Sequence, residues 1–407
     1  MNMRRVVITG MGIWSCLGTS LDEVTNSLRQ GKNGIVSIPT RSEYGLHCPL
    51  VGNIPKPDLK PLLHDRRARQ SMSEETEYAY MAAHQAFLQA GITDDFLLQN
   101  EVGILFGNDT SVRAVIDIHE LMELYHDTAS IPSGMLFRAE SSSPTISLSS
   151  IFHLRGINAS IGAACASSAH AIGLATLLIR HGLQDMVLVG GCQEVNQWEA
   201  PAFEAIGAFS QDTNPDTACR PFDKHRSGLV PSGGAAALIL EEYEHAVARG
   251  ANILAEVIGY GFSSNGIGMS EPSREGEKRS MERALRDANL QPLDIDYINA
   301  HATSTVAGDI EEAIAVTKLF GDKQPLISST KSMTGHECWM AGASEVLYSI
   351  LMMQNGFVAP NIHLDEVDES AAKLRLVSET TEVRLKTIMS NSFGFGGTNS
   401  TLIIRKI

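Results

Sequence analysis

The sequence of 407 residues lacks several features that mark particular classes of protein. No stretch approaches the ~20 apolar residues of a membrane-spanning helix. The short apolar run near the start is broken by Gly10 and Gly12, which predicts a strand and turn rather than a signal peptide. The six cysteines, at positions 16, 48, 165, 192, 219 and 338, form no C-x-x-C pair of the metal-binding kind. We therefore expect a cytoplasmic protein that does not enter a membrane and whose thiols are reduced.

Basic residues are scarce relative to acidic ones. Lys and Arg number 32 and Asp and Glu number 47, which gives a net charge of −15. A field of that sign argues against nucleic acid as a partner. Hydrophobic residues make up 43% of the chain, which is ordinary for a globular protein that builds its own core.

Short apolar or β-branched runs bounded by glycine or polar turns predict strands. These strands span Arg5–Thr9, Val102–Phe106, Met186–Val189, Ala235–Leu240, Ala255–Gly261, Tyr297–Ala300, Thr387–Ser390 and Thr401–Arg405. Between them, helical spacing of apolar residues predicts helices at Thr76–Ala90, Ala166–Arg180, Arg274–Ala288 and Gly342–Gln354. This alternation is typical of an α/β fold with buried central sheets.

Two parts of the chain follow a similar plan. Each has a strand, then helices, then a turn of small residues that leads into an apolar helix, and then another strand. We therefore expect an N-terminal half, 1–250, and a C-terminal half, 251–407, with the boundary near Gly250. The polar, proline-bearing stretch Phe106–Ser149 is expected to form a long insertion or cap outside the core.

The segment GAACASSAH places Cys165 among small residues at the start of a predicted helix. The positive end of a helix dipole favours a thiolate, and small neighbours leave room for a substrate and for inward-pointing backbone N–H groups. A strand-to-helix turn of this kind follows the logic of other nucleophile turns. A buried structural cysteine is the alternative, and the neighbouring motifs favour the nucleophile.

Two histidines stand in unusual settings. NAHATST puts His301 at the C-terminal end of a predicted strand, where ligands bind in α/β sheets. SSTKSMTGHECWMAGASE puts His336 in a glycine-bounded turn, five residues after Lys331. A cysteine and two histidines at strand ends form a reasonable nucleophile-and-base set, but spacing alone does not prove that they meet.

Two glycine-rich segments remain. SNSFGFGGTNS, residues 390–400, surrounds Phe395 with Gly394 and Gly396, and it can present backbone N–H groups to an oxyanion or form a simple hairpin turn. ITGMGIWS near the start resembles a dinucleotide-binding fingerprint, but Ser15 replaces its third glycine. An NAD-binding oxidoreductase is therefore the rival class of enzyme.

The motifs GAACASSAH, HATST, TKSMTGH and SNSFGFGGTN occur in the order and at the separations found in the 3-oxoacyl-acyl-carrier-protein synthases, or β-ketoacyl synthases. RPFDKHRSG, EEYEHAVARGA and the ending MSNSFGFGGTNSTLIIRK match as well, so the resemblance covers nearly the whole chain. The chain resembles synthase I more than synthase II. The resemblance implies a thiolase-like α/β fold with five layers, α-β-α-β-α, built from two similar halves, and it implies a homodimer.

The resemblance also implies a mechanism. Cys165 takes an acyl group from acyl-carrier protein, and malonyl-acyl-carrier protein is then decarboxylated and condensed with it, as in fatty-acid elongation. His301 and His336 hold the malonyl thioester carbonyl, while the N–H groups of Cys165 and Phe395 meet the oxyanion. No cofactor is implied, because the carrier's phosphopantetheine brings the activated groups.

Further roles follow from the same resemblance. Lys331 and Glu345 pair near His336, and Phe395 acts as a gate. Asp309 and Glu312 are expected to be structural, with a bound cation as one option and no catalytic metal. Contacts to the substrate are expected from Thr303, Thr305, Glu345, Thr110, Gly394 and Gly396.

Several residues depart from the family pattern. The departures are Ala302 for glycine, Ser227 for aspartate, Glu337, Cys338, Trp339 and Met340 in a run of small residues, and polar Asn108, Asp109 and Thr110 near the expected acyl pocket. These departures bear on the identity of the acyl substrate more than on the type of reaction. They also fit ketosynthases of type II polyketide or polyene pathways, which can form a heterodimer with a non-catalytic chain-length partner.

Acyl-carrier proteins are acidic, as the family implies, so a chain at −15 needs a local basic patch to bind one. DRRARQ is the best candidate, because Arg66, Arg67 and Arg69 lie together in a stretch that the family uses for carrier contact. A solvated helix face is the alternative.

Overall fold

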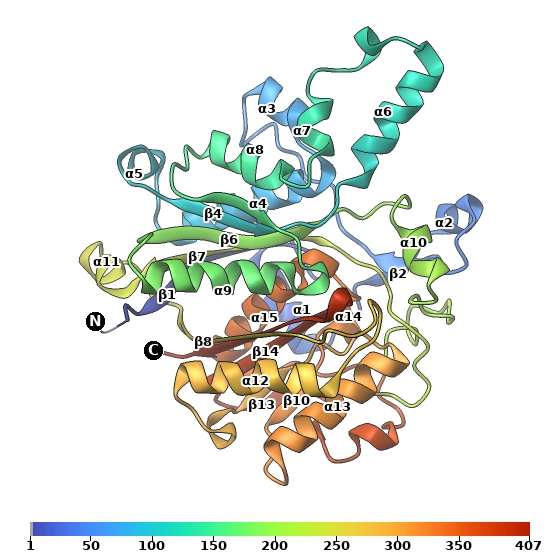
Figure 1. Ribbon diagram of the computed structural model, residues 1–407, viewed down its shortest axis with the longest axis vertical. Helices are drawn as coiled ribbons and strands as arrows, with labels where there is room; N and C mark the ends of the chain where they lie inside the picture. Colours follow the sequence, from blue (N-terminus) through green and yellow to red (C-terminus); the bar gives the residue numbers. More distant parts are fainter. Residues whose placement is uncertain (1–2) are drawn as a thin grey trace.

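Strands β1 (Val6–Trp14) and β8 (Ala255–Ser264) lie side by side at the centre of the molecule and join two sheets into one. They pair through Val7 and Ile8 of β1, and beyond this short contact each strand follows its own sheet. The structure is a computed structural model that describes residues 3–407 (Figure 1). Together the strands form an 11-stranded mixed sheet.

The two sheets repeat one topology. The first has the order β5-β4-β6-β7-β1 and the second the order β12-β10-β9-β14-β15-β8. Besides β1 and β8, the strands are β4 (Gly103–Gly107), β5 (Asn158–Ile161), β6 (Met186–Gln193), β7 (Gly234–Glu242), β9 (Tyr297–Asn299), β10 (Leu326–Ser328), β12 (Arg375–Leu376), β14 (Thr387–Gly394) and β15 (Thr398–Arg405). In each sheet three neighbouring strands run parallel, β5-β4-β6 in the first and β10-β9-β14 in the second. The next two strands, β7 and β1 or β15 and β8, each pair antiparallel with the strand before them. The predicted likeness of two halves is confirmed, with β12 as an extra edge strand.

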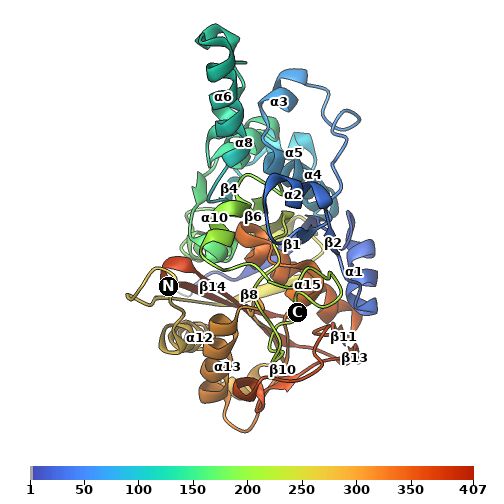
Figure 2. The same cartoon turned by 90° about the vertical axis from the view of Figure 1, so that its right-hand side faces the viewer.

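Three layers of helices alternate with the two sheets (Figures 1 and 2). The inner layer holds α9 (Ser167–Arg180) and α15 (Ala341–Asn355), and the outer layers hold α4 (Glu74–Gln89) and α8 (Ser143–Ile151) on the first sheet and α12 (Arg274–Ala288) and α13 (Val306–Phe320) on the second. The predicted five-layered α-β-α-β-α arrangement is therefore confirmed.

The sequence of each helix matches its layer. Residues 341–353 of α15 are buried on every side, as an all-round apolar helix requires between two sheets. In α12, by contrast, the buried residues recur at helical spacing, and its polar face meets solvent. Ser273 caps the start of α12, and Asn289 ends it in the left-handed conformation, which is why its bounds agree with the prediction.

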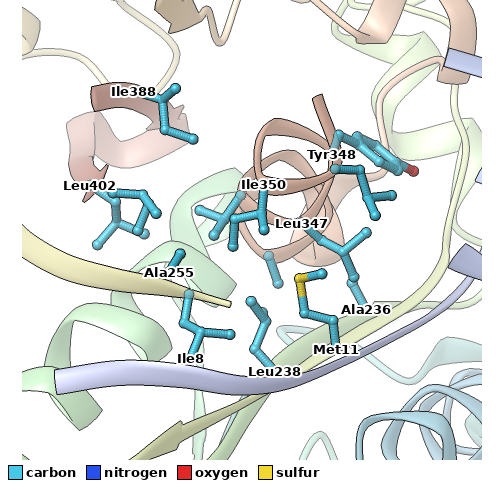
Figure 3. Close-up of a cluster of buried hydrophobic side chains, with 14 of the residues drawn as sticks. Ile8, Met11, Ala236, Leu238, Ala255, Leu347, Tyr348, Ile350, Ile388 and Leu402 are labelled. Atoms are coloured by element: carbon cyan, nitrogen blue, oxygen red, sulfur yellow. The ribbon is translucent and has the colours of Figure 1, made fainter. Parts of the chain in front are cut away.

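The main hydrophobic cluster lies between the two sheets, around the inner helices. Figure 3 shows Met11 of β1 and Leu238 of β7 facing Leu347 and Ile350 of α15. All four side chains are fully buried. This packing holds the middle of α15 against the first sheet.

Gly10 and Gly12 correct one prediction. The first strand does not stop at Thr9 but runs through both glycines to Trp14. A Cβ at Gly10 would lie 2.2 Å from the Ala86 oxygen of α4, so the glycines allow the helix to pack closely on the strand. The strand–turn–helix of a dinucleotide site is therefore missing at this motif.

The expected insertion Phe106–Ser149 is shorter than predicted. Helices α6 (Val112–Tyr125) and α7 (Met135–Ala139), with the short turn Thr128–Ser130, form an arm that projects from the body (Figures 1 and 2). Helix α8, however, packs on α4 within the outer layer. Its buried Leu148 makes it part of the core.

The remaining elements connect these layers. They are α1 (Leu21–Gln30), α2 (Pro39–Tyr44), α3 (Arg66–Ser71), α5 (Asp94–Gln99), α10 (Ala200–Ala205), α11 (Tyr243–Ala248), α14 (Lys331–Thr334), the β2 (Ile35–Ser37) and β3 (Leu50–Gly52) pair, and the β11 (Phe357–Val358) and β13 (Thr381–Glu382) pair. Within residues 3–407, every helix is too short or too polar to cross a bilayer. The boundary near Gly250 stays a prediction.

Candidate active site

Cys165 lies in a strained turn between a strand and a helix. The chain leaves β5, forms a short helical turn at Ala164–Ala166 and enters α9 at Ser167. Ala164 adopts φ 46°, a left-handed conformation that is costly for a residue with a Cβ. Its N–H donates to Asp109 Oδ2 at 3.1 Å, which holds the turn and presents the Cys165 side chain at the start of α9.

The two predicted histidines reach this thiol from the other half of the chain. His336 follows α14, and its Nε2 lies 3.0 Å from Cys165 Sγ. His301 follows β9, and its ring stands nearly perpendicular to that of His336, with 5.4 Å between the ring centroids. One nitrogen of each ring and the sulfur all lie within 4.8 Å of one another. A metal could also be held there, but it would occupy the thiol and so prevent nucleophilic attack.

Burial changes the expected state of the thiol. It raises the pKa of Cys165 to about 12, while Lys331 and the backbone N–H groups of Phe395 and Cys165 act in the opposite direction. The buried group is therefore a thiol at rest, because loss of water outweighs the effect of the helix start. The start of α9 still favours the thiolate that forms during attack, and His336 is positioned to accept the proton.

Both imidazoles are neutral. Burial, together with the positive charge of Lys331, holds the pKa values of His301 and His336 well below their usual range. A neutral imidazole can donate one N–H to a carbonyl oxygen and accept at its other nitrogen. The pair can thus bind a substrate carbonyl without adding a charge to it.

Lys331 and Glu345 form a buried pair behind His336. The Lys331 Nζ donates to Glu345 Oε1, and each side chain is 1% exposed. Burial raises the pKa of Glu345 to about 8, and Lys331 opposes this. Neither residue reaches the cavity beside Cys165. In the structure the Glu345 carboxyl group contacts Lys331, and its expected contact with substrate stays a prediction.

A cavity of about 380 Å³ opens onto the thiol and both imidazoles. Thr303 and Thr305 line it, and their hydroxyls share a hydrogen bond of 3.0 Å. Phe395 also lines it, and its exposed ring stacks on that of Phe203 with 6.4 Å between the centroids. Gly396 has φ 77°, which lets the chain turn sharply at Phe395. The remaining lining includes Gly394, Val306, Met269, Asn265, Asn399 and Glu277.

Residues 3–246 match the family model for the N-terminal domain of β-ketoacyl synthases, and residues 254–365 match the one for their C-terminal domain. The chain belongs to the β-ketoacyl synthase family. It is 42% identical to 3-oxoacyl-[acyl-carrier-protein] synthase 1 of Escherichia coli strain K12 over the full length of both chains. As a member of this family it is a condensing acyltransferase, which replaces the rival class of NAD-binding oxidoreductase.

Solved structures of the family agree with the observed fold. This synthase superposes on a β-ketoacyl synthase from Burkholderia phymatum STM815 with a TM-score of 0.94 and 36% identity. It superposes on the ishigamide ketosynthase/chain length factor with a TM-score of 0.91 and 30% identity. Both comparisons cover 100% of each chain.

In this β-ketoacyl synthase, Asp309 and Glu312 are occupied by protein donors. Glu312 accepts from the backbone N–H groups of His301 and Ala302 at 3.0 and 2.7 Å, so it positions the catalytic loop. Asp309 accepts from a backbone N–H at 2.9 Å, and Arg226 lies 3.4 Å away. Arg226 places a positive charge beside Asp309 and also pairs with Asp368, and a bound cation at Asp309 stays a prediction.

Some functional positions were missed or misplaced from the sequence. Asp109 was noted as a departure, but its bond to the turn beside Cys165 was not foreseen. Thr110 does not line the main cavity, and its hydroxyl instead donates to Glu199 at 2.9 Å. Glu337 is buried directly beside His336. The signal in the sequence that could have identified Glu337 is an acidic residue among apolar neighbours.

The predicted basic cluster lies on α3. Arg66 and Arg67 are exposed, and Asp65 caps the helix by accepting from the N–H groups of Arg67 and the residue after it. The Arg69 guanidinium instead donates to the Leu63 carbonyl and is partly buried. Two of the three arginines are thus available to a partner.

Proposed function

We propose that this synthase carries an acyl group on Cys165 and condenses it with malonyl-acyl-carrier protein, as in fatty-acid elongation. The observation that carries the proposal is the 3.0 Å contact between His336 Nε2 and Cys165 Sγ, with His301 beside both at the end of one cavity. A thiol, two neutral imidazoles and an apolar approach suit thioester chemistry, in which a carbonyl must be bound and a proton moved.

The first step is acyl transfer. Cys165 Sγ attacks the carbonyl carbon of the incoming thioester, its proton passes towards His336 and then to the leaving thiol, and a new thioester forms on the enzyme. The N–H groups of Cys165 and Phe395 hold the oxyanion of this step. Each such donor contributes about 3–4 kcal/mol to transition-state stabilisation.

The second step forms the carbon–carbon bond. His301 and His336 donate N–H groups to the malonyl thioester oxygen, so the enolate that forms on loss of carbon dioxide is stabilised. The enolate carbon attacks the acyl carbonyl, the bond to Cys165 Sγ breaks, and the thiolate takes up a proton from solvent water. The two thioesters and these side chains account for every bond change, so the mechanism requires no further cofactor.

Thr303 and Thr305 are proposed to bind the phosphopantetheine arm. Their hydroxyls line the cavity, and Val306 and Met269 provide apolar walls for the same arm. The proposal is tested by mixing the enzyme with acyl-carrier substrates and measuring its intact mass. The wild-type protein gains one acyl group and then forms 3-oxoacyl-carrier protein when malonyl-carrier protein is added.

The matched control uses a second buried cysteine. Cys165→Ala should gain no acyl group, whereas Cys192→Ala, altered within β6, should still be acylated. Acylation of Cys165→Ala at the wild-type rate would contradict the proposed nucleophile. Both variants need a circular dichroism spectrum like that of the wild-type protein.

Arg66 and Arg67 are proposed to contact the acidic carrier, because both are exposed on one short helix. Reversing these two charges should raise the Michaelis constant for the carrier substrate several-fold, since rim charges steer association. A small pantetheine thioester without the protein should react at the wild-type rate. Equal losses with both substrates would mean that the helix supports the site instead. Arg69 is left unchanged, because its bond to Leu63 is structural.

A ketosynthase of a type II polyketide or polyene pathway is the second candidate. It is favoured by the similarity to the ishigamide ketosynthase/chain length factor and by the polar residues Asn108, Asp109 and Thr110 beside the site. The two candidates differ in the partner. We propose a homodimer for the fatty-acid enzyme, which condenses when purified alone, whereas the polyketide enzyme would need a heterodimer. Native mass spectrometry of the purified chain, followed by the condensation assay, separates them.

A further inference from the structure

A second, much smaller cavity lies next to the main one. Phe203 lines both, and Cys338 and Glu199 line the second. Its volume is about 20 Å³, which accommodates about one water and no alkyl chain. An acyl group on Cys165 therefore finds little empty space in this direction.

Hydrogen-bonded side chains fill the space instead. The Trp339 Nε1–H donates to Thr110 Oγ1 at 3.4 Å, and the Thr110 hydroxyl donates to Glu199 Oε1 at 2.9 Å. Gln193 Nε2 donates to the other Glu199 oxygen at 2.6 Å. Trp339 is 5% exposed. We call these four residues, Trp339, Thr110, Glu199 and Gln193, the acyl wall.

The acyl wall is attached to the catalytic turns. Trp339 belongs to the short helical turn Cys338–Met340, which packs against the turn that carries Cys165. Its ring lies 6.4 Å from that of Phe203, which lines the main cavity. Thr110 follows Asp109, whose carboxylate holds the backbone beside Cys165. The wall is therefore a neighbour of the nucleophile.

The backbone of the acyl wall has little room to move away from the thiol. The Trp339 carbonyl oxygen approaches Gly191 of β6 so closely that a Cβ there would lie 2.7 Å from it. Cys338 adopts φ 45°, which fixes the direction in which the chain enters the turn. A long acyl chain would have to swing the indole ring out and break its hydrogen bond, leaving Thr110 and Glu199 to face hydrocarbon.

We propose that Trp339, supported by Thr110 and Glu199, limits the acyl group on Cys165 to short chains. This inference rests on the proposed function and names the substrate class of that site. The main cavity gives a long chain no alternative, because it is the cavity proposed above for the phosphopantetheine arm. Short acyl groups end before the wall and meet only the side chains around the thiol.

The test compares rates of acylation by one carrier protein loaded with acetyl, butanoyl, hexanoyl, octanoyl or dodecanoyl groups, read by intact mass. In the wild-type enzyme, octanoyl should load about 10-fold or more slowly than acetyl, the scale of discrimination that a closed pocket gives. Trp339→Ala should raise the octanoyl-to-acetyl ratio about 10-fold or more. Trp339→Leu, which disturbs packing less, should raise it in the same direction.

Trp14→Ala is the matched control. Its indole donates to the Pro55 carbonyl at 2.6 Å and lies outside both cavities, so its loss should leave the ratio at the wild-type value. Equal loading of octanoyl and acetyl by the wild-type enzyme would overturn the inference. So would an unchanged ratio in folded Trp339→Ala and Trp339→Leu. Failure of every acyl group to load would overturn the proposed function itself, and the inference with it.

Discussion

Glu337 is a carboxyl group enclosed by protein next to His336. It is 1% exposed, it accepts from the Tyr348 hydroxyl at 2.8 Å, and the Ser344 hydroxyl donates to its other oxygen. Burial raises its pKa from 4.5 to about 7, although both hydroxyls and Lys331 lower it. The group therefore links the stability of the fold to pH.

The sign follows from where the proton is bound. Well below pH 4.5, Glu337 is protonated in both the folded and the unfolded chain, so it does not change the free energy of unfolding. Above that pH the unfolded chain releases the proton first, and stability falls until the folded group also ionises near pH 7. The difference between these two pKa values corresponds to about 3 kcal/mol of lost stability above pH 7.

Glu337→Gln removes the titration and keeps the shape. The amide oxygen still accepts one hydroxyl, and a disturbed hydrogen bond costs about 1 kcal/mol at any pH. The variant should therefore be less stable than wild type by about 1 kcal/mol near pH 4 and more stable by about 2 kcal/mol near pH 8. The two stability curves should cross between these values.

Urea unfolding at a fixed protein concentration, followed by intrinsic fluorescence, measures both curves. Tyr348→Phe is the matched control, because it removes one hydroxyl that bonds to Glu337 and leaves the carboxyl in place. It should lose about 1 kcal/mol and still become less stable as pH rises, with the fall continuing to a higher pH because a hydroxyl that lowers the pKa of Glu337 is lost. Parallel curves for Glu337→Gln and wild type would refute the reasoning, since Glu337 would then ionise alike in both states.

Two other sets of variants test the site. His301→Ala and His336→Ala should still be acylated at Cys165, the second more slowly because it loses the acceptor 3.0 Å from Sγ, yet both should condense poorly. Intact mass and product assays decide this, and unimpaired condensation would refute the proposed role in decarboxylation. Lys331→Met should lose about 3–5 kcal/mol of stability, because it leaves Glu345 buried without its partner. Adding Glu345→Leu should restore most of the melting temperature but not condensation, and a double variant as unstable as the single one would argue against a buried pair.

Local features of the chain could be predicted because their causes are local. The bounds of α12 follow from the caps at Ser273 and Asn289, and the central position of α15 follows from apolar residues on every side. By contrast, the early end assigned to β1 was wrong. Gly10 and Gly12 are typical of turns, and only the approach of α4 shows why glycine is needed within a strand.

The sequence by itself determined eight strands of the main sheet and four of the helices, the small-residue setting of Cys165 and the family resemblance, because these depend on neighbouring residues and on ordered motifs. It missed the short strands β5, β10 and β12 of the same sheet. Only the tertiary structure decided that His336 lies 3.0 Å from Cys165, since 171 residues separate them along the chain. It alone decided the charge states as well. A helix start favours a thiolate, but the pKa of Cys165 rises because the surrounding layers remove the water that would stabilise the charge.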